Sequence, residues 1–393
     1  MMAALAAARQ GVRVTLYERQ NRIGRKLAAT GNGRCNLSNT HVDPSHYHGE
    51  DSRFCGSVLK QESVMQSLKR FQDMGLLTVE EKDGRIYPMS DHAGSVVDVL
   101  RFSLDAFGVK VTCGSPVTGL RRLPRGFLLQ TEDQQDPADT VIVCCGGKAG
   151  GKLGGVGDGY ELLKSLGHSC TELRPALVQL RTAGTVTRGL KGVRTQAHVL
   201  VRNGDHILAE ERGEVQFTEY GLSGPAIFSV SRDAVRNPEA MLSLDLFPDI
   251  PADDLQALLR RRAETRPGLT LDDLFTGTVQ NRLGRVLVSS AGLSGAMPLS
   301  ASFGVLPVLA ERAKNFCFRI TGDLGFDQAQ VTSGGIRTRE FDPKTLESRL
   351  CPGLYACGEV LDVDGDCGGY NLQWAWSSGW VAGTNAAGGG ELC

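Results

Sequence analysis

The opening residues carry two successive patterns of apolar positions, one typical of a helix and one typical of a strand. Residues 1–10 are rich in alanine, and Gly11 stands where a helix commonly ends in a left-handed residue. Residues 12–18 predict a short strand that ends at the acid Glu18. Helix, strand and acid in this order are the second half of a dinucleotide-binding βαβ unit, whose carboxylate binds ribose hydroxyls. An ordinary helix–strand connection is the alternative interpretation.

The first half of such a unit is a strand followed by a Gly-x-Gly-x-x-Gly turn, about 20 residues before the acid. That position falls upstream of Met1, so we expect a dinucleotide-binding domain whose phosphate-binding turn is missing through a late start or an incomplete fragment. The amides of that turn hold a pyrophosphate, and we therefore expect the chain to bind its dinucleotide more weakly than a form extended upstream.

Apolar runs and turn residues predict the elements further along the chain. A continuous β-branched run at 140–145 predicts a strand buried on both faces. Before residue 171, the other predicted elements are helices near 56–75, 91–106 and 161–166 and a meander of strands near 109–113, 116–122 and 126–131. Between 172 and 330 they are strands near 177–182, 196–203, 214–218 and 241–246 and helices near 252–264 and 271–288. A final strand ends at Gly358-Glu359 and precedes an amphipathic helix from 372 to about 385.

Glycine is the unusual component, with 49 residues concentrated in clusters that follow predicted strands. The first cluster lies in the loop 24–39, which also carries Arg25, Lys26 and Arg34. The second begins with Gly146 and Gly147, and the third contains Gly358, Gly368 and Gly369. Because α/β sheets bind ligands at the carboxyl ends of their strands, the clusters predict a site where the backbone closely approaches a ligand. A solvated turn is the alternative for the first cluster.

Charge and cysteine content limit the class of protein. The net charge of −1 provides no global attraction to nucleic acid or membrane. No apolar run approaches the roughly 20 residues of a membrane span, and the N-terminus lacks the basic region of a signal peptide. The 11 cysteines are odd in number and scattered, so we expect free thiols in a reducing cytoplasm.

A metal site is not expected. Asp362, Asp364 and Asp366 have the alternate spacing of a calcium-binding loop, but Leu372 stands where such a loop requires glutamate. The cysteines show no paired Cys-x-x-Cys spacing, which argues against zinc.

Three motif blocks resemble the bacterial flavoproteins of the BaiN/RdsA family, also called YhiN or aminoacetone-oxidase-like NAD(P)/FAD-dependent oxidoreductases. They are GRKLAATGNGRCNLSN at 24–39, GDGYELLKSLGH at 157–168, and the segment from VTSGG at 331–335 to GEVLDVDGDCGGYNLQWAWSSG at 358–379. Their order and spacing match over almost the whole chain. The family's first strand and its Gly-x-Gly-x-x-Gly turn are not in the chain, and Ala149 and Gly151 replace the usual small polar and proline residues.

The resemblance implies a Rossmann-type two-dinucleotide-binding flavoprotein fold of class α/β. Its FAD-binding domain would comprise 1–171 and 331–393, and 172–330 would be an inserted β-barrel-like and helical domain. FAD would bind without covalent attachment, with NADH or NADPH as the electron donor. The implied cofactor-binding residues are Glu18, Arg25, Lys26, Gly31, Gly33, Arg34, Asn36, Gly146, Gly147, Gly358, Glu359, Gly368, Gly369, Asn371 and Leu372.

The family's assigned chemistry leaves the substrate open. Its members reduce bile-acid intermediates, carry the name of an aminoacetone oxidase, or form dihydrouridine in 23S ribosomal RNA. A basic stretch in the inserted domain is what RNA phosphates would require, although a solvated strand edge is the alternative. Its members are Arg174, Arg181, Arg188, Lys191, Arg194 and Arg202, accompanied by the single acid Glu172.

Three functions therefore compete at this stage. The first is hydride transfer through FAD to uridine of 23S ribosomal RNA, the second is flavin chemistry on a small steroid-like or amine substrate, and the third is a non-catalytic nucleotide-binding remnant. Cys35 is a candidate proton donor because it lies in the loop implied beside the flavin, with a small packing residue as the alternative. His168, after a predicted helix end, is expected to be structural.

Overall fold

The computed structural model describes residues 1–388, and these divide into two units. Unit 1 comprises Met1–Arg174 and the segment from Gln330 onward, and unit 2 comprises Pro175–Ala329. Each unit contains a hydrophobic core of its own. The boundaries of unit 2 lie close to those expected for the inserted domain.

Two parallel strand pairs form the framework of unit 1. Strand β1 (Thr15–Glu18) pairs with β6 (Lys110–Cys113), and β10 (Val141–Val143) pairs with β19 (Leu354–Ala356). Within the described residues the two pairs are separate sheets. The strands predicted to end at Glu18 and before the second and third glycine clusters are thus confirmed, and all of them are parallel.

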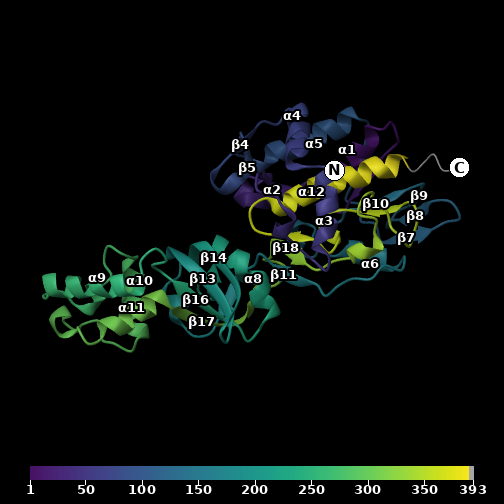
Figure 1. Ribbon diagram of the computed structural model, residues 1–393. Coiled ribbons are helices and arrows are strands. Elements are labelled where there is room, and N and C mark those ends of the chain that lie inside the picture. The colour runs from purple at the N-terminus through teal and green to yellow at the C-terminus, as the bar shows by residue number, and fades with distance from the viewer. Residues whose placement is uncertain (389–393) are drawn as a thin grey trace. The chain divides into compact units, whose positions relative to one another are not determined.

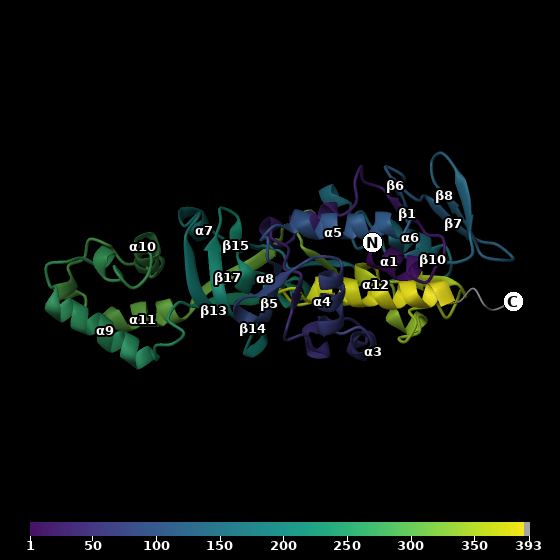
Figure 2. The same ribbon diagram turned by 90° about the horizontal axis from the view of Figure 1, so that it is seen from above.

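Helices α1 (Met2–Ala8) and α12 (Tyr370–Gly388) pack against each other, as both ribbon views show (Figures 1 and 2), and α12 also contacts β10 and β19. Every residue of α1 is buried. The close contact between the two helices requires small residues, because a Cβ at Gly383 would lie 2.2 Å from the carbonyl oxygen of Ala3. The alanine-rich start of the chain is therefore a core helix.

The remaining elements of unit 1 surround this framework. Its other helices are α2 (Arg25–Ala29), α3 (Ser52–Gln61), α4 (Val64–Asp73), α5 (Ala93–Ala106) and α6 (Asp158–Lys164). Its other strands are β2 (Ser38–Asn39), β3 (Tyr47–His48), β4 (Thr78–Glu80), β5 (Arg85–Pro88), β7 (Gly119–Arg122), β8 (Phe127–Gln130), β9 (Gln135–Ala138), β18 (Val331–Ser333) and β20 (Asp364–Gly365).

Two predictions for unit 1 are wrong in detail. The helix expected at 56–75 is broken into α3 and α4, because Ser63 forms a capping box with Gln66 and begins a new helix. The strand near 109–113 is not part of the meander, which consists of β7, β8 and β9. Strand β9 escaped prediction because its polar residues and Pro137 are unusual in strands.

Unit 2 contains a closed barrel of antiparallel strands in the order β12-β15-β14-β13-β16-β17. These are β12 (Leu180–Thr182), β13 (Arg194–Asn203), β14 (His206–Phe217), β15 (Gly221–Ser223), β16 (Met241–Asp245) and β17 (Phe316–Asp323), and β11 (Arg174–Ala176) precedes them. The helices are α7 (Val186–Gly189), α8 (Pro225–Arg236), α9 (Ala252–Thr265), α10 (Asn281–Ser290) and α11 (Leu306–Lys314). The expected barrel with helices is confirmed, although the helix predicted at 271–288 is shortened to α10.

Candidate functional site

The glycine loops of unit 1 converge on the carboxylate of Glu359, just after β19. Lys26 from the first loop donates to Glu359 Oε2 at 2.7 Å, across 333 residues of sequence. The backbone N–H of Thr332 donates to Glu359 Oε1 at 2.8 Å. The Glu359 side chain is only 17% exposed, so this carboxylate is held between a cation and an amide at the edge of the interior.

The second glycine loop lies against the same carboxylate. A Cβ at Gly147 would be 2.8 Å from Glu359 Oε1 and 2.4 Å from Thr332 Oγ1, so only glycine fits there. Thr332 Oγ1 in turn accepts hydrogen bonds from Lys148 N at 2.8 Å and Ala149 N at 3.0 Å. Sequence reasoning assigned no role to Thr332, whose only signal was its place in the motif block that begins at Val331, and the structure shows it to be buried.

The third glycine cluster contacts the first loop. A Cβ at Gly369 would lie 2.3 Å from the carbonyl oxygen of Ser38, and Asn39 Nδ2 donates to Gly368 O at 3.0 Å. The side chain of Asn371 bonds both the N–H and the carbonyl of Gly365, each at 2.8 Å. Leu372 is half-buried against the core. The backbone that leads into α12 is thereby fixed beside the first loop.

Two buried polar atoms where the glycine loops meet lack hydrogen-bond partners in the part of the chain that the structure describes, which suits a polar ligand such as FAD. The hydroxyl of Tyr160 and Asn36 Oδ1 are buried without a hydrogen-bond partner within the described residues. Burial raises the pKa of Tyr160, with the charge of Glu359 contributing. Gly146 and Gly358 both have φ of 74°, and a Cβ at Gly358 would meet open space. Buried polar atoms normally have partners, so these positions suit an additional donor and acceptor.

The other expected cofactor residues have different surroundings. Glu18 Oε1, at the end of β1, accepts from Gln20 N at 2.8 Å, and Arg25 donates to the side chain of Gln20. Arg34 forms ion pairs with Glu81 at 2.6 Å and with Asp91. Its charge is therefore compensated by these two acids and not by Glu359. All three glycines of the loop have left-handed backbones, Gly24 at φ 75°, Gly31 at φ 56° and Gly33 at φ 86°.

Cys35 is completely buried in the core that contains Leu27 and Leu37. Burial raises the pKa of its thiol to about 11, although a hydrogen bond with Thr30 opposes the shift. This environment matches the packing alternative, and Cys35 has no part in the function proposed below.

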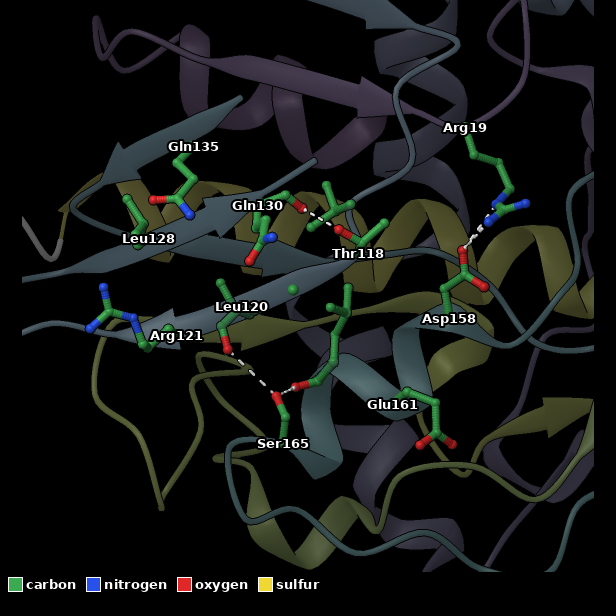
Figure 3. Close-up of a pocket in the computed structure, with 13 residues that line it drawn as sticks. Arg19, Thr118, Leu120, Arg121, Leu128, Gln130, Gln135, Asp158, Glu161 and Ser165 are labelled. Atoms are coloured by element: carbon green, nitrogen blue, oxygen red, sulfur yellow. Dashed lines mark hydrogen bonds and ion pairs between the residues drawn. The ribbon is translucent and has the colours of Figure 1, made fainter. Parts of the chain in front are cut away.

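A separate cavity of about 550 Å³ opens beside Arg19, the residue after Glu18. Arg19 pairs with Asp158 at 2.7 Å on one wall, and residues of β7 and β8 form the other, with Ser165 of the α6 end between them (Figure 3). None of the expected cofactor residues lines it.

Several residues of the basic stretch in unit 2 form ion pairs or hydrogen bonds with their neighbours. Lys191 pairs with Glu219 at 2.7 Å, and Arg194 pairs with Glu214 on β14 at 3.5 Å. Arg181 donates to a backbone carbonyl of β17. The stretch is thus closer to a charged strand edge than its sequence alone indicates, although Arg188 and Arg202 have no ion pair within the described residues.

Comparison with known proteins places the chain in a family. A family model described as HI0933-like protein Rossmann domain matches residues 1–385. The chain is 40% identical to 3-dehydro-bile acid delta(4,6)-reductase of Clostridium scindens, over 98% of this chain and 96% of that protein. It is 29% identical to ribosomal RNA dihydrouridine synthase of Escherichia coli, over 97% and 94% respectively.

Among solved structures, the open conformation of a flavocytochrome c3 fumarate reductase has a TM-score of 0.49 at 15% identity, covering 99% of this chain and 76% of that one. Within residues 1–388, no helix combines the length and the apolar character that a membrane crossing requires. The family match over nearly all of the chain shows that the protein belongs to the HI0933-like family of FAD-dependent oxidoreductases.

Proposed function

We propose that the protein reduces a conjugated carbon–carbon double bond in a small 3-oxo steroid-like substrate. The observation that carries this proposal is the 40% identity, over 98% of the chain, to a relative named as a bile acid delta(4,6)-reductase. The ion pairs of Lys191 and Arg194 also reduce the free positive charge available to RNA phosphates in unit 2.

The residues around Glu359 would hold the cofactor. Glu18 and Glu359 would accept hydrogen bonds from hydroxyl groups, and the glycines at 146 and 147 would allow the backbone to approach a ligand closely. The N-terminal end of α12 would stabilise negative charge near Asn371. When bound, FAD supplies the hydride, and we propose NADH or NADPH as the donor that reduces it.

Reduction of uridine in ribosomal RNA is the second candidate function. The relatives of Escherichia coli and Haemophilus influenzae named as ribosomal RNA dihydrouridine synthases are 29% and 27% identical to the chain. The exposed Arg188 and Arg202 could contact phosphates. The two reactions share one chemistry, because the reducible bond of uracil, like that of an enone, is conjugated to a carbonyl group.

The proposal is tested by offering each of the two substrates separately to the reduced protein. The purified protein, loaded with FAD and reduced anaerobically with dithionite, is mixed with a 3-oxo-4,6-diene steroid or with a uridine-containing fragment of 23S ribosomal RNA. We expect the steroid to reoxidise the flavin and to gain two hydrogens by mass spectrometry, and the saturated 3-oxo steroid to leave the flavin reduced. Reoxidation by the RNA alone would establish the second candidate, and reoxidation by neither substrate would contradict both.

A further inference from the structure

Two histidines share one carboxylate at the antiparallel ladder between β3 and β20. His46 Nδ1 lies 3.0 Å from Asp366 Oδ2, and His48 Nε2 lies 2.7 Å from Asp366 Oδ1. His46 ends a short 3-10 helix and His48 lies in β3, and both rings reach the one carboxylate from these two positions. The backbone N–H of Asp366 donates to the carbonyl of His46 at 3.0 Å, which fixes the two segments together.

The ring of His46 is held in one orientation. It stacks on Tyr370 with centroids 4.4 Å apart and an interplanar angle of 22°. Tyr370 is itself fixed, because the hydroxyl of Tyr47 donates to its carbonyl at 3.0 Å. Asp366 occupies Nδ1, and Nε2 of His46 has no hydrogen bond within the described residues. Because the side chain is 35% exposed, Nε2 can be reached by another molecule.

This cluster is continuous with the candidate cofactor site. Asp366 and Tyr370 flank the third glycine cluster, which contacts Ser38 and Asn39 of the first loop. The orphaned Asn36 Oδ1 would lie 2.9 Å from a Cβ at Gly369. The group is not arranged to hold a metal ion, since no such set of side chains occurs in the described part of the chain.

On the basis of the proposed function, we propose that His46 is the proton donor of the reaction and that Asp366 and His48 are positioning residues. Hydride addition to the β-carbon of the substrate's C=C–C=O system brings two electrons, with the reduced flavin as the reductant. The π electrons shift toward the carbonyl oxygen and give an enolate. The Nε2–H bond of His46 then breaks, a C–H bond forms at the α-carbon, and the neutral imidazole regains its proton from water. The same step would deliver the proton to uracil.

Charged and titratable groups from several elements lie around His46. Asp43 precedes it in the same segment, Asp366 follows β20, and Tyr370 begins α12. Arg85 of β5 acts on Tyr370, and Cys55 of α3 lies near Asp43. A general acid must be protonated, so the rate of the wild-type protein should fall as pH rises.

Single-turnover reduction of the preferred substrate, followed across pH, tests the role of His46. We expect His46→Gln to slow this step by about 10²–10⁴-fold and to abolish its fall at high pH, with FAD affinity within about twofold of wild type. His48→Gln should slow it by less than about tenfold, and the exposed His206→Gln should leave it unchanged. A wild-type rate and pH profile in His46→Gln would overturn the assignment. Because wild-type turnover is measured in parallel, that result differs from failure of the proposed function, in which wild type reduces neither substrate.

A second measurement is independent of turnover. In the protein without substrate, ring ¹⁵N NMR signals should show a proton on Nδ1 of His46, because Asp366 is its acceptor. Asp366→Ala, which has no side-chain acceptor, should remove that preference, while circular dichroism reports whether the variant is folded. An unchanged tautomer in a folded Asp366→Ala protein would overturn the positioning role of Asp366.

Discussion

At the scale of single residues, Glu359 makes structural contacts and is also the proposed acceptor for FAD hydroxyls. Its two oxygens are occupied by Lys26 and by the N–H of Thr332, yet it lies beside the orphaned hydroxyl of Tyr160. A carboxylate that is only 17% exposed and already fixed by two partners needs little reorganisation to accept a further hydroxyl donor.

Replacement of Glu359 by alanine should therefore weaken FAD binding. Loss of a charge-assisted hydrogen bond costs about 1.5–3 kcal/mol, equivalent to about one to two decades in Kd. The measurement is titration of the protein with FAD, followed by flavin fluorescence. Glu161→Ala is the matched control, because Glu161 is 77% exposed and should change the affinity by less than about 0.5 kcal/mol. Equal affinities for wild type and Glu359→Ala would make Glu359 a structural acid alone.

His168 makes the stability of unit 1 sensitive to acid. Its Nδ1 lies 2.9 Å from Glu340 Oε2 and its Nε2 lies 2.9 Å from Ser348 Oγ, both in the interior. Burial lowers the pKa of the His168 imidazole, although Glu340 opposes the shift. Despite its own burial, Glu340 has a lowered pKa because Ser169 and His168 donate to it. The native state thus holds a neutral imidazole and a charged carboxylate.

Acidification should therefore destabilise the protein in two ranges. Below about pH 6.5 the unfolded chain protonates His168 while the native state does not, and below about pH 4.3 the same applies to Glu340. His168→Gln should cost about 1–3 kcal/mol at neutral pH through lost buried hydrogen bonds. The free energy of unfolding by urea should then fall less steeply between about pH 7 and 5 than in wild type. Parallel slopes for the two proteins would show that His168 titrates normally in the fold.

From the sequence, candidate site residues could be predicted where their chemistry is visible locally. Glycine clusters after strands, Lys26 and Glu359 were predicted from strand ends and the family resemblance, and the structure brings them together. Thr332 and the His46–Asp366 contact were not predicted, because their partners are distant in sequence and their residue types are ordinary. The ion pairs of Arg34 with Glu81 and Asp91 could not be predicted either, because these acids lie far from it in the sequence.

At the scale of elements, segments with long apolar patterns were predicted correctly, and short polar strands were not. The helix at the start of the chain, the buried strand at 140–145 and the final helix were all predicted, because each has many apolar positions. Strand β9 was missed because its polar residues and its proline are unusual in strands, and the break between α3 and α4 was missed because it depends on a single cap. The pairing of β6 with β1 joins segments far apart in the sequence, and no local sequence pattern specifies it.

The crossing of α1 and α12 gives a test of packing at this scale. Gly383→Ala would place a Cβ 2.2 Å from Ala3 O and 2.8 Å from Ala6 Cβ, so the helices must separate. We expect a loss of about 1–3 kcal/mol in the free energy of unfolding, as for other overpacked cores. In Gly388→Ala, where a Cβ meets nothing, helix propensity should give a gain of up to about 1 kcal/mol. Urea unfolding curves of the two variants measure the difference, and equal stabilities would exclude a tight crossing.

At the scale of the whole molecule, the proposed cofactor residues all belong to unit 1. Glu18, Lys26, Gly147 and Glu359 lie in its two segments, whereas unit 2 has a barrel core to which none of them contributes. The family resemblance implies an inserted domain at 172–330, because its motif blocks fall on both sides of that range. No local pattern showed that the barrel closes, since closure depends on β12 pairing with the distant β17.

FAD binding should consequently protect unit 1 and leave unit 2 unchanged. A ligand at 100 times its Kd stabilises the native form that binds it by about 2.7 kcal/mol, and only amides that open together with the site gain this protection. Hydrogen–deuterium exchange measured by mass spectrometry should therefore slow in peptides of β1, β10, β19 and α12 when FAD is added. Peptides from β13, β14 and α9 should exchange at the same rate with and without FAD. Glu359→Ala should lose the slowing at an FAD concentration that protects wild type. Equal protection of the barrel strands would instead show that both units unfold as one cooperative structure.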